Sequence, residues 1–128
     1  MARIDPQPGN VYVGAGGVIR GEDAGIQPVP KDMLPDVKGV YVGGCIRTGM
    51  GTLRNNADAH AHVAKTDSHR GWVCFQGPAD LQSHRIRMHE LAHIRTGQGH
   101  TDAWRAEMAR LGEPIPRRNQ RRQPKKRS

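Results

Sequence analysis

The stretch that most constrains the fold is 88–100, which reads MHELAHIRTGQGH. It contains the pattern His-Glu-x-x-His, and one more histidine follows after a glycine-containing break. On a helix, His89 and His93 lie nearly above one another, so both imidazoles can reach a single ion. Glu90 is rotated by about 100° from His89, close to that ion without having to bind it. The pattern predicts a helical metal site, with His100 as the candidate third ligand.

Three neutral imidazoles and an open fourth position are typical of a catalytic zinc site. We therefore predict one Zn²⁺ per chain and a metalloendopeptidase in which Glu90 is the general base for a zinc-activated water. A purely structural zinc more often has four protein ligands, including cysteine. Neither Cys45 nor Cys74 lies in this stretch, and both are predicted to be buried free thiols.

The rest of the chain predicts an α+β fold, with a small and mainly antiparallel sheet packed against a long helix that carries the His-Glu-x-x-His motif. That helix is expected over 79–96, and a following helix from Thr101, as N-cap, to Leu111. A turn is expected over 48–51, and the segments 58–64 and 71–75 should form a hairpin. The predicted strands lie near 11–19, 40–47, 58–64 and 71–75.

Three further side chains are weaker candidates for the site. His60 and His62 alternate with alanines in a predicted strand, so they share one face. They can face the metal cleft and hydrogen-bond a tetrahedral intermediate, or simply occupy a half-exposed strand. Tyr41 is a candidate oxyanion donor. Trp104 is expected to pack against the metal helix and help to hold His100.

The net charge of +8 is concentrated in the last residues of the chain. Outside them, 13 Lys and Arg face 12 Asp and Glu. The segment 117–128 is therefore expected to be a basic, disordered tail, which either binds nucleic acid through phosphate contacts or only increases solubility. Its cations are Arg117, Arg118, Arg121, Arg122, Lys125, Lys126 and Arg127.

The remaining organisation follows from composition. Only 35% of the residues are hydrophobic, so the core should be small and a bound metal would stabilise it. We divide the chain into a Gly- and Pro-rich segment 1–38, a domain 39–116 and the tail 117–128. The sequence shows neither an apolar signal region nor a run of transmembrane length, which predicts a cytoplasmic protein without a membrane partner.

At this point the motifs resemble a known family. His89–His93 with Gly99–His100 and Trp104 is similar to the SprT-like zinc metallopeptidases, which include the Spartan proteases, and especially to their small versions in actinobacteria and phages. The segments 59–62 and 71–75 strengthen the resemblance, which covers roughly 57–116. It implies three histidine ligands, a glutamate base and a protein substrate, and, for a phage protein, the host cytoplasm. The link between the second and third histidines is shorter than in Spartan-type proteins, and no Cys-rich zinc ribbon follows.

Other classes stay open. In a metzincin the last histidine would come one residue earlier, and a methionine turn would follow. ImmA-type peptidases, which cut repressors, take an acidic third ligand, for which Asp102 or Glu107 lies close enough in sequence. The main alternative is a nucleic-acid-binding or virion-associated protein, in which the zinc is structural or vestigial and the basic tail binds DNA.

Overall fold

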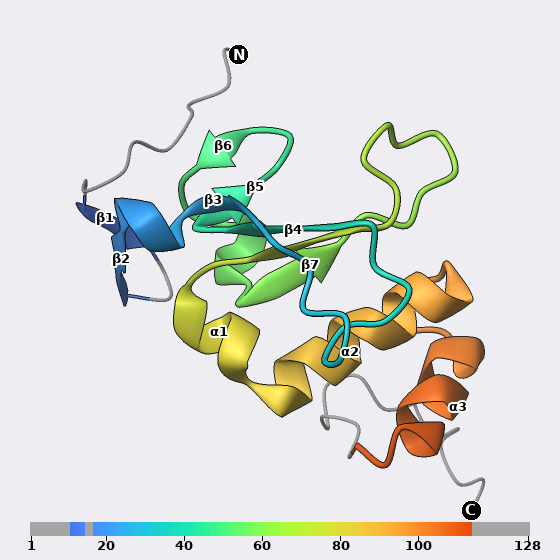
Figure 1. The fold of residues 1–128 in the computed structure, drawn as a ribbon. Coiled ribbons are helices and arrows are strands. Elements are labelled where there is room, and N and C mark those ends of the chain that lie inside the picture. The colour runs from blue at the N-terminus through green and yellow to red at the C-terminus, as the bar shows by residue number, and fades with distance from the viewer. Residues whose placement is uncertain (1–10, 15–16, 114–128) are drawn as a thin grey trace, which may run out of the picture.

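The computed structural model describes residues 11–14 and 17–113. Its central sheet has the strand order β3–β4–β8–β7 (Figure 1). Strand β4 pairs with β8 in parallel, and the two outer pairings are antiparallel. The predicted α+β class and the predicted hairpin are confirmed, although the central pairing is parallel. These strands are β3 (Gly25–Gln27), β4 (Gly39–Val42), β7 (Ala59–Ala61) and β8 (Trp72–Phe75).

Two small ribbons accompany the sheet. One pairs β1 (Val11–Gly14) with β2 (Gly17–Arg20), and the other pairs β5 (Gly44–Cys45) with β6 (Gly49–Met50). The strand predicted over 40–47 is therefore divided, because Gly43 has a φ of 97°, a left-handed conformation that favours glycine. The predicted turn over 48–51 contains β6. Two short 3₁₀ helices, η1 (Gly21–Asp23) and η2 (Arg54–Asn56), complete these connections.

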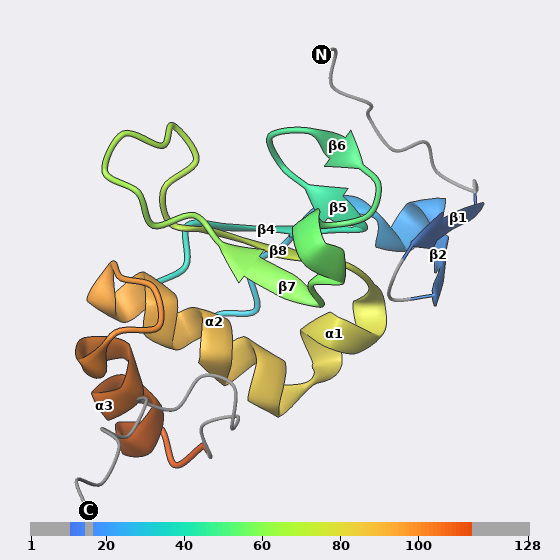
Figure 2. The same cartoon turned by 180° about the vertical axis from the view of Figure 1, so that it is seen from behind.

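Three α-helices lie on one side of the sheet, and the β5–β6 ribbon lies on the other (Figures 1 and 2). They are α1 (Pro78–Gln82), α2 (His84–Thr96) and α3 (Asp102–Arg110). The single long helix predicted over 79–96 is not found. Ser83 has an extended ψ of 115°, and its Oγ accepts a hydrogen bond from the backbone N–H of Ile86 at 3.3 Å. A serine N-cap thus starts a new helix where the pattern predicted a continuous one.

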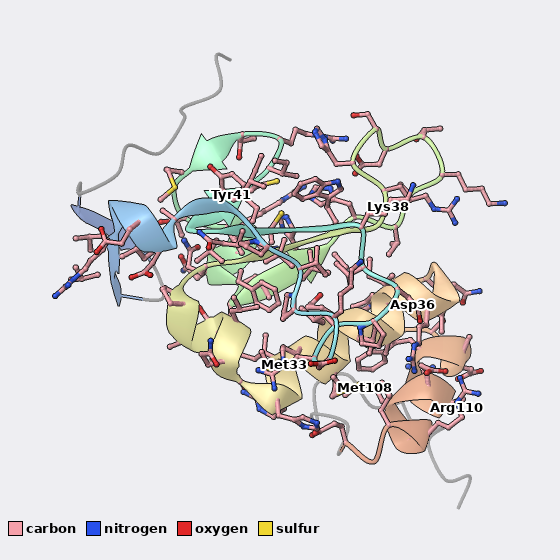
Figure 3. The ribbon with its side chains drawn as sticks, in the orientation of Figure 1. Met33, Asp36, Lys38, Tyr41, Met108 and Arg110 are labelled. Carbon is pink, nitrogen blue, oxygen red and sulfur yellow. The ribbon has the colours of Figure 1, made fainter. Side chains whose placement is uncertain are left out.

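The two faces of the sheet are both buried, under different elements. Val73 and Phe75 of β8 face the helices and pack in a cluster with Leu91 of α2. Cys74, between them, points to the opposite face and packs with Tyr41. In Figure 3, Tyr41 lies on the side of the sheet away from the helices, whereas Met108 lies among them. This alternation decides which side chains can meet at each site.

Part of the N-terminal segment belongs to this same core. Strand β3 pairs with β4, and Leu34 and Val37 are buried against the helix-facing side of the sheet. Residues 25–37 are therefore packed together with the domain predicted over 39–116. Among the described residues, none of the helices combines the length and apolar character needed to cross a membrane. The predicted tail 117–128 lies outside the described residues.

Candidate metal centre

The His-Glu-x-x-His motif lies on α2, and the three predicted ligands come together. One nitrogen from each of His89, His93 and His100 lies within 4.8 Å of the other two. The Nε2 atoms of His89 and His100 are 3.1 Å apart. Because tetrahedral zinc with Zn–N bonds of about 2.05 Å separates two nitrogen ligands by about 3.3 Å, this spacing fits a shared ion. The structure therefore places the three candidate ligands close together, and their role as zinc ligands stays a prediction.

The turn after α2 brings the third histidine back to the helix. Gly97 caps α2 in the left-handed conformation, with a φ of 66°. The next carbonyl, on Gln98, accepts a hydrogen bond from His93 Nδ1 at 2.7 Å. This bond fixes the tautomer of His93 and leaves its Nε2 as the ligand atom. Arg105 holds the end of the turn, since its Nη1 donates to the carbonyl of His100 at 2.7 Å.

Trp104 packs against α2 and contacts His100, as predicted. Its side chain is fully buried, and its ring contacts all three imidazoles, with centroid distances of 4.8 Å to His89, 5.3 Å to His93 and 4.6 Å to His100. The indole Nε1 donates a hydrogen bond to the carbonyl of His89 at 3.2 Å. Helix α3 places it there, because Thr101 caps that helix by accepting from the Trp104 N–H. One aromatic residue therefore orients three ligands.

Glu90 lies at the edge of a groove beside this cluster. The groove is lined by residues of α2, which include His89 and Glu90, by residues 55–59 and by His100. Burial raises the pKa of the Glu90 carboxyl to about 8, because desolvation disfavours its charged form. Burial likewise lowers the pKa of His93 to about 4, which keeps this ring neutral as a metal ligand must be.

The two acids considered as alternative ligands have other partners. Asp102 Oδ1 pairs with Arg105 Nη2 at 2.5 Å. Glu107 is buried and pairs with Arg110 and, at 3.2 Å, with Arg95 of α2. Among the described residues, the group that gathers around His89 consists of histidines alone. The geometry favours the three-histidine set over one with an acidic third ligand.

The three weaker candidates lie elsewhere. His60 is opposite Cys74 in the β7–β8 register, so it shares the sheet face that points away from α2. His62 Nε2 lies 3.4 Å from Cys74 Sγ on that same face. Tyr41 is 2% exposed and packs in the cluster with Cys74. None of the three is among the residues that line the groove. The structure thus corrects their placement in the cleft, because side chains that alternate along a strand point to opposite faces.

Two of these three residues, His60 and His62, belong to a second polar cluster. Cys45, His60, His62 and Cys74 each offer a ligand atom within 4.8 Å of the others, and together they can bind a metal ion. The hydrogen bond between the two thiols lowers the pKa of Cys45 and raises that of Cys74, and a hydrogen bond that the His62 ring donates to the Cys45 sulfur raises the pKa of His62. Both cysteines are free and Cys74 is buried, as predicted, whereas Cys45, which was also predicted to be buried, is only half-buried.

Sequence reasoning did not predict this cluster, although one signal for it was present. The His-x-His pair lies on a predicted strand, and a cysteine lies on the strand predicted to pair with it. The fourth member, Cys45, joins only because the chain turns at Gly43 and lays β5 over the sheet, with Gly43 N–H bonded to the carbonyl of Phe75. That approach is non-local, and the spacing of the residues does not indicate it.

No protein-family model, curated protein or solved structure matches the chain. The resemblance to SprT-like peptidases therefore depends on the motif residues themselves. The cations of the predicted DNA-binding tail lie outside the described residues.

Proposed function

We propose that this chain is a zinc-dependent metalloendopeptidase of the SprT-like type, which cleaves a protein substrate. The observation that carries the proposal is the meeting of three imidazoles with a buried carboxyl group at one groove. His89, His93 and His100 supply the ligands, and Glu90 lies on the groove beside them. A set of three histidines leaves one coordination position for water or substrate, as catalytic zinc sites do.

Each residue has a distinct task in this proposal. The three histidines hold the ion, and the bond from His93 Nδ1 to Gln98 orients one of them. Zinc, when bound, lowers the pKa of a water it binds to about 7 and polarises a carbonyl. In its ionised form, which a bound cation beside it would favour over the neutral acid, Glu90 takes a proton from the attacking water and returns it to the leaving amine. Trp104 keeps the rings in place by packing beneath them.

The groove lies beside an edge strand of the sheet. It runs between α2 and residues 55–59, which lead into β7, and β7 lies alongside α2 (Figure 2). Strand β7 is at the edge of the four-stranded sheet and pairs with β8 on its other side. An edge strand offers backbone N–H and C=O groups to an extended peptide. We therefore propose that an unfolded or extended protein segment, held along β7, is the form of substrate that reaches Glu90.

The proposal is tested by comparing wild type with Glu90→Gln on a broad panel of unfolded proteins. Loss of the general base should lower the rate of cleavage by about 10²–10⁴-fold while zinc content stays unchanged. Glu113→Gln is the matched control, because Glu113 pairs with His84 at the start of α2, away from the groove lining. Cleavage by Glu90→Gln at the wild-type rate contradicts the mechanism.

A second function is motivated by the charge of the tail. Seven cations over 117–127, with no acid among them, suit a nucleic-acid-associated or virion-associated protein with a structural or vestigial zinc site. Several phosphate contacts would give sequence-independent binding that weakens steeply with salt. The test compares the full chain with one lacking 117–128, titrated with duplex DNA at two salt concentrations. Equal affinities at both would end the tail proposal, and retained Glu90-dependent cleavage would leave the peptidase in place.

A further inference from the structure

We propose that Cys45, His60, His62 and Cys74 form a second metal site, a closed structural zinc site on the face of the sheet opposite to α2. The proposal does not depend on the peptidase function, because it involves different residues and a different face. Two thiolates and two imidazoles are a ligand set that zinc uses in structural sites, and four protein ligands leave no position for a substrate. The chain would then hold two zinc ions of different kinds.

The distances match a tetrahedral site. His62 Nε2 lies 3.5 Å from Cys45 Sγ and 3.4 Å from Cys74 Sγ. For Zn–S bonds of about 2.3 Å and Zn–N bonds of about 2.05 Å, tetrahedral geometry separates sulfur and nitrogen ligands by about 3.6 Å. The two measured separations differ from this value by a few tenths of an ångström at most. The other pairs of ligand atoms also lie within 4.8 Å of one another, so side-chain movements can close the site around an ion.

The ligands are supported as metal ligands usually are. His62 Nδ1 donates to Asp67 Oδ2 at 2.8 Å, which aims its Nε2 at the two sulfurs. Asp67 is itself held by the N–H of His69 and by Arg47, each at 2.8 Å. A carboxylate–histidine pair of this kind fixes the orientation of the ring and raises its basicity.

Backbone groups support the sulfurs in the same way. The N–H of Ile46 donates to Cys74 Sγ, and the N–H of Arg47 donates to Cys45 Sγ, each at 3.4 Å. Such bonds stabilise a negatively charged sulfur, the form that binds a metal. Both donors come from the two residues that follow Cys45, so one short segment supplies a ligand and positions two sulfurs.

One atom of the cluster needs a partner. Among the described residues, the buried Nε2 of His60 has no hydrogen-bond partner. A buried polar nitrogen without a partner costs free energy, and native structures rarely keep one. His60 is opposite Cys74 on the same face of the β7–β8 ladder, so an ion shared with the two sulfurs would satisfy its ring.

Two other structures that these four side chains could form, an iron–sulfur cluster and a disulfide, fit the observed arrangement less well. A Rieske-type [2Fe–2S] cluster places its cysteines on one iron and its histidines on the other, which separates sulfur from nitrogen. Here a histidine nitrogen lies within 3.5 Å of both sulfurs. A disulfide between Cys45 and Cys74 would leave both histidines without a task, and both cysteines are free. A single tetrahedral ion uses all four side chains.

The test is zinc content of the full chain, produced with zinc and freed of loosely bound metal. Wild type should hold about two zinc ions per chain, and Cys45→Ser, at the half-buried position, about one. His69→Asn is the matched control, since His69 lies on the same connection near His62 but outside the cluster, and it should keep about two.

A measurement on wild type covers the case in which the cysteine variant fails to fold. Replacement of zinc by cobalt(II) should give thiolate-to-cobalt charge-transfer absorption, and the native thiols should react with a thiol reagent only after chelation. Absence of the charge-transfer band, thiols that react equally with and without metal, or a mass showing a Cys45–Cys74 disulfide would each overturn the proposal.

Discussion

The two polar clusters lie on opposite faces of one sheet and differ in how closed they are. The three-histidine cluster draws two ligands from α2 and one, the exposed His100, from the turn that follows. It opens onto a groove with Glu90 on its wall. The second cluster draws Cys45 from β5, His60 from β7 and Cys74 from β8, and His62 follows directly after β7.

Because of this difference, we assign catalysis to the three-histidine cluster and stabilisation of the fold to the second cluster. A site with three ligands and a groove leaves room for water, substrate and a base, whereas a site with four protein ligands has room only for its ion. In a chain with 35% hydrophobic residues, a closed ion that links β5, β7 and β8 would stabilise the sheet on which the open site depends. If the two clusters are independent, a variant of one should leave the ion of the other in place.

The largest effect is expected for Trp104→Ala. Removing this fully buried side chain should lower the free energy of unfolding by about 3–5 kcal/mol. The three-histidine cluster should also lose its zinc, while the second polar cluster keeps its ion. Urea unfolding and zinc content measure the two effects. Met108→Leu, a volume-conserving change in the same apolar cluster, is the control and should cost less than about 1.5 kcal/mol. Full zinc retention by Trp104→Ala would show that the Trp104 side chain does not position the three histidines.

A smaller effect, confined to the other cluster, is expected for Asp67→Asn. The carboxylate that orients His62 would be lost, so zinc affinity there should fall by about 10–100-fold. Competition with a chromophoric chelator measures it, with the exposed Asp32→Asn as control. Activity per three-histidine zinc should not change. An affinity equal to that of the control would mean that His62 is not oriented through Asp67.

Local parts of both the fold and the site could be predicted from the sequence. The spacing of His89 and His93 is set by the helical repeat, and Gly97 and Thr101 end one helix and begin the next through bonds within a few residues. The hairpin of β7 and β8 also followed from alternation and a polar turn.

Features that depend on contacts far apart in sequence could not be predicted. The parallel pairing of β4 with β8 joins residues about thirty positions apart, and no local pattern encodes it. For the same reason, the sequence did not indicate that His60 lies on the face of the sheet away from the groove. Nor did it indicate that the turn at Gly43 brings Cys45 to the second polar cluster. The break at Ser83 was local, but its capping bond to Ile86 competes with an apolar pattern that continues through it.

The most direct test of the account is the zinc content of His100→Ala, compared with wild type and with His84→Ala. His84 is exposed at the start of α2 and outside both clusters, so its variant should match wild type. His100→Ala should lose the ion at the three-histidine cluster and with it the cleavage of unfolded proteins, while cobalt(II) still reports a thiolate-bound ion. Tight zinc binding unchanged from wild type, with cleavage intact, would contradict the account, because the third ligand would then lie elsewhere.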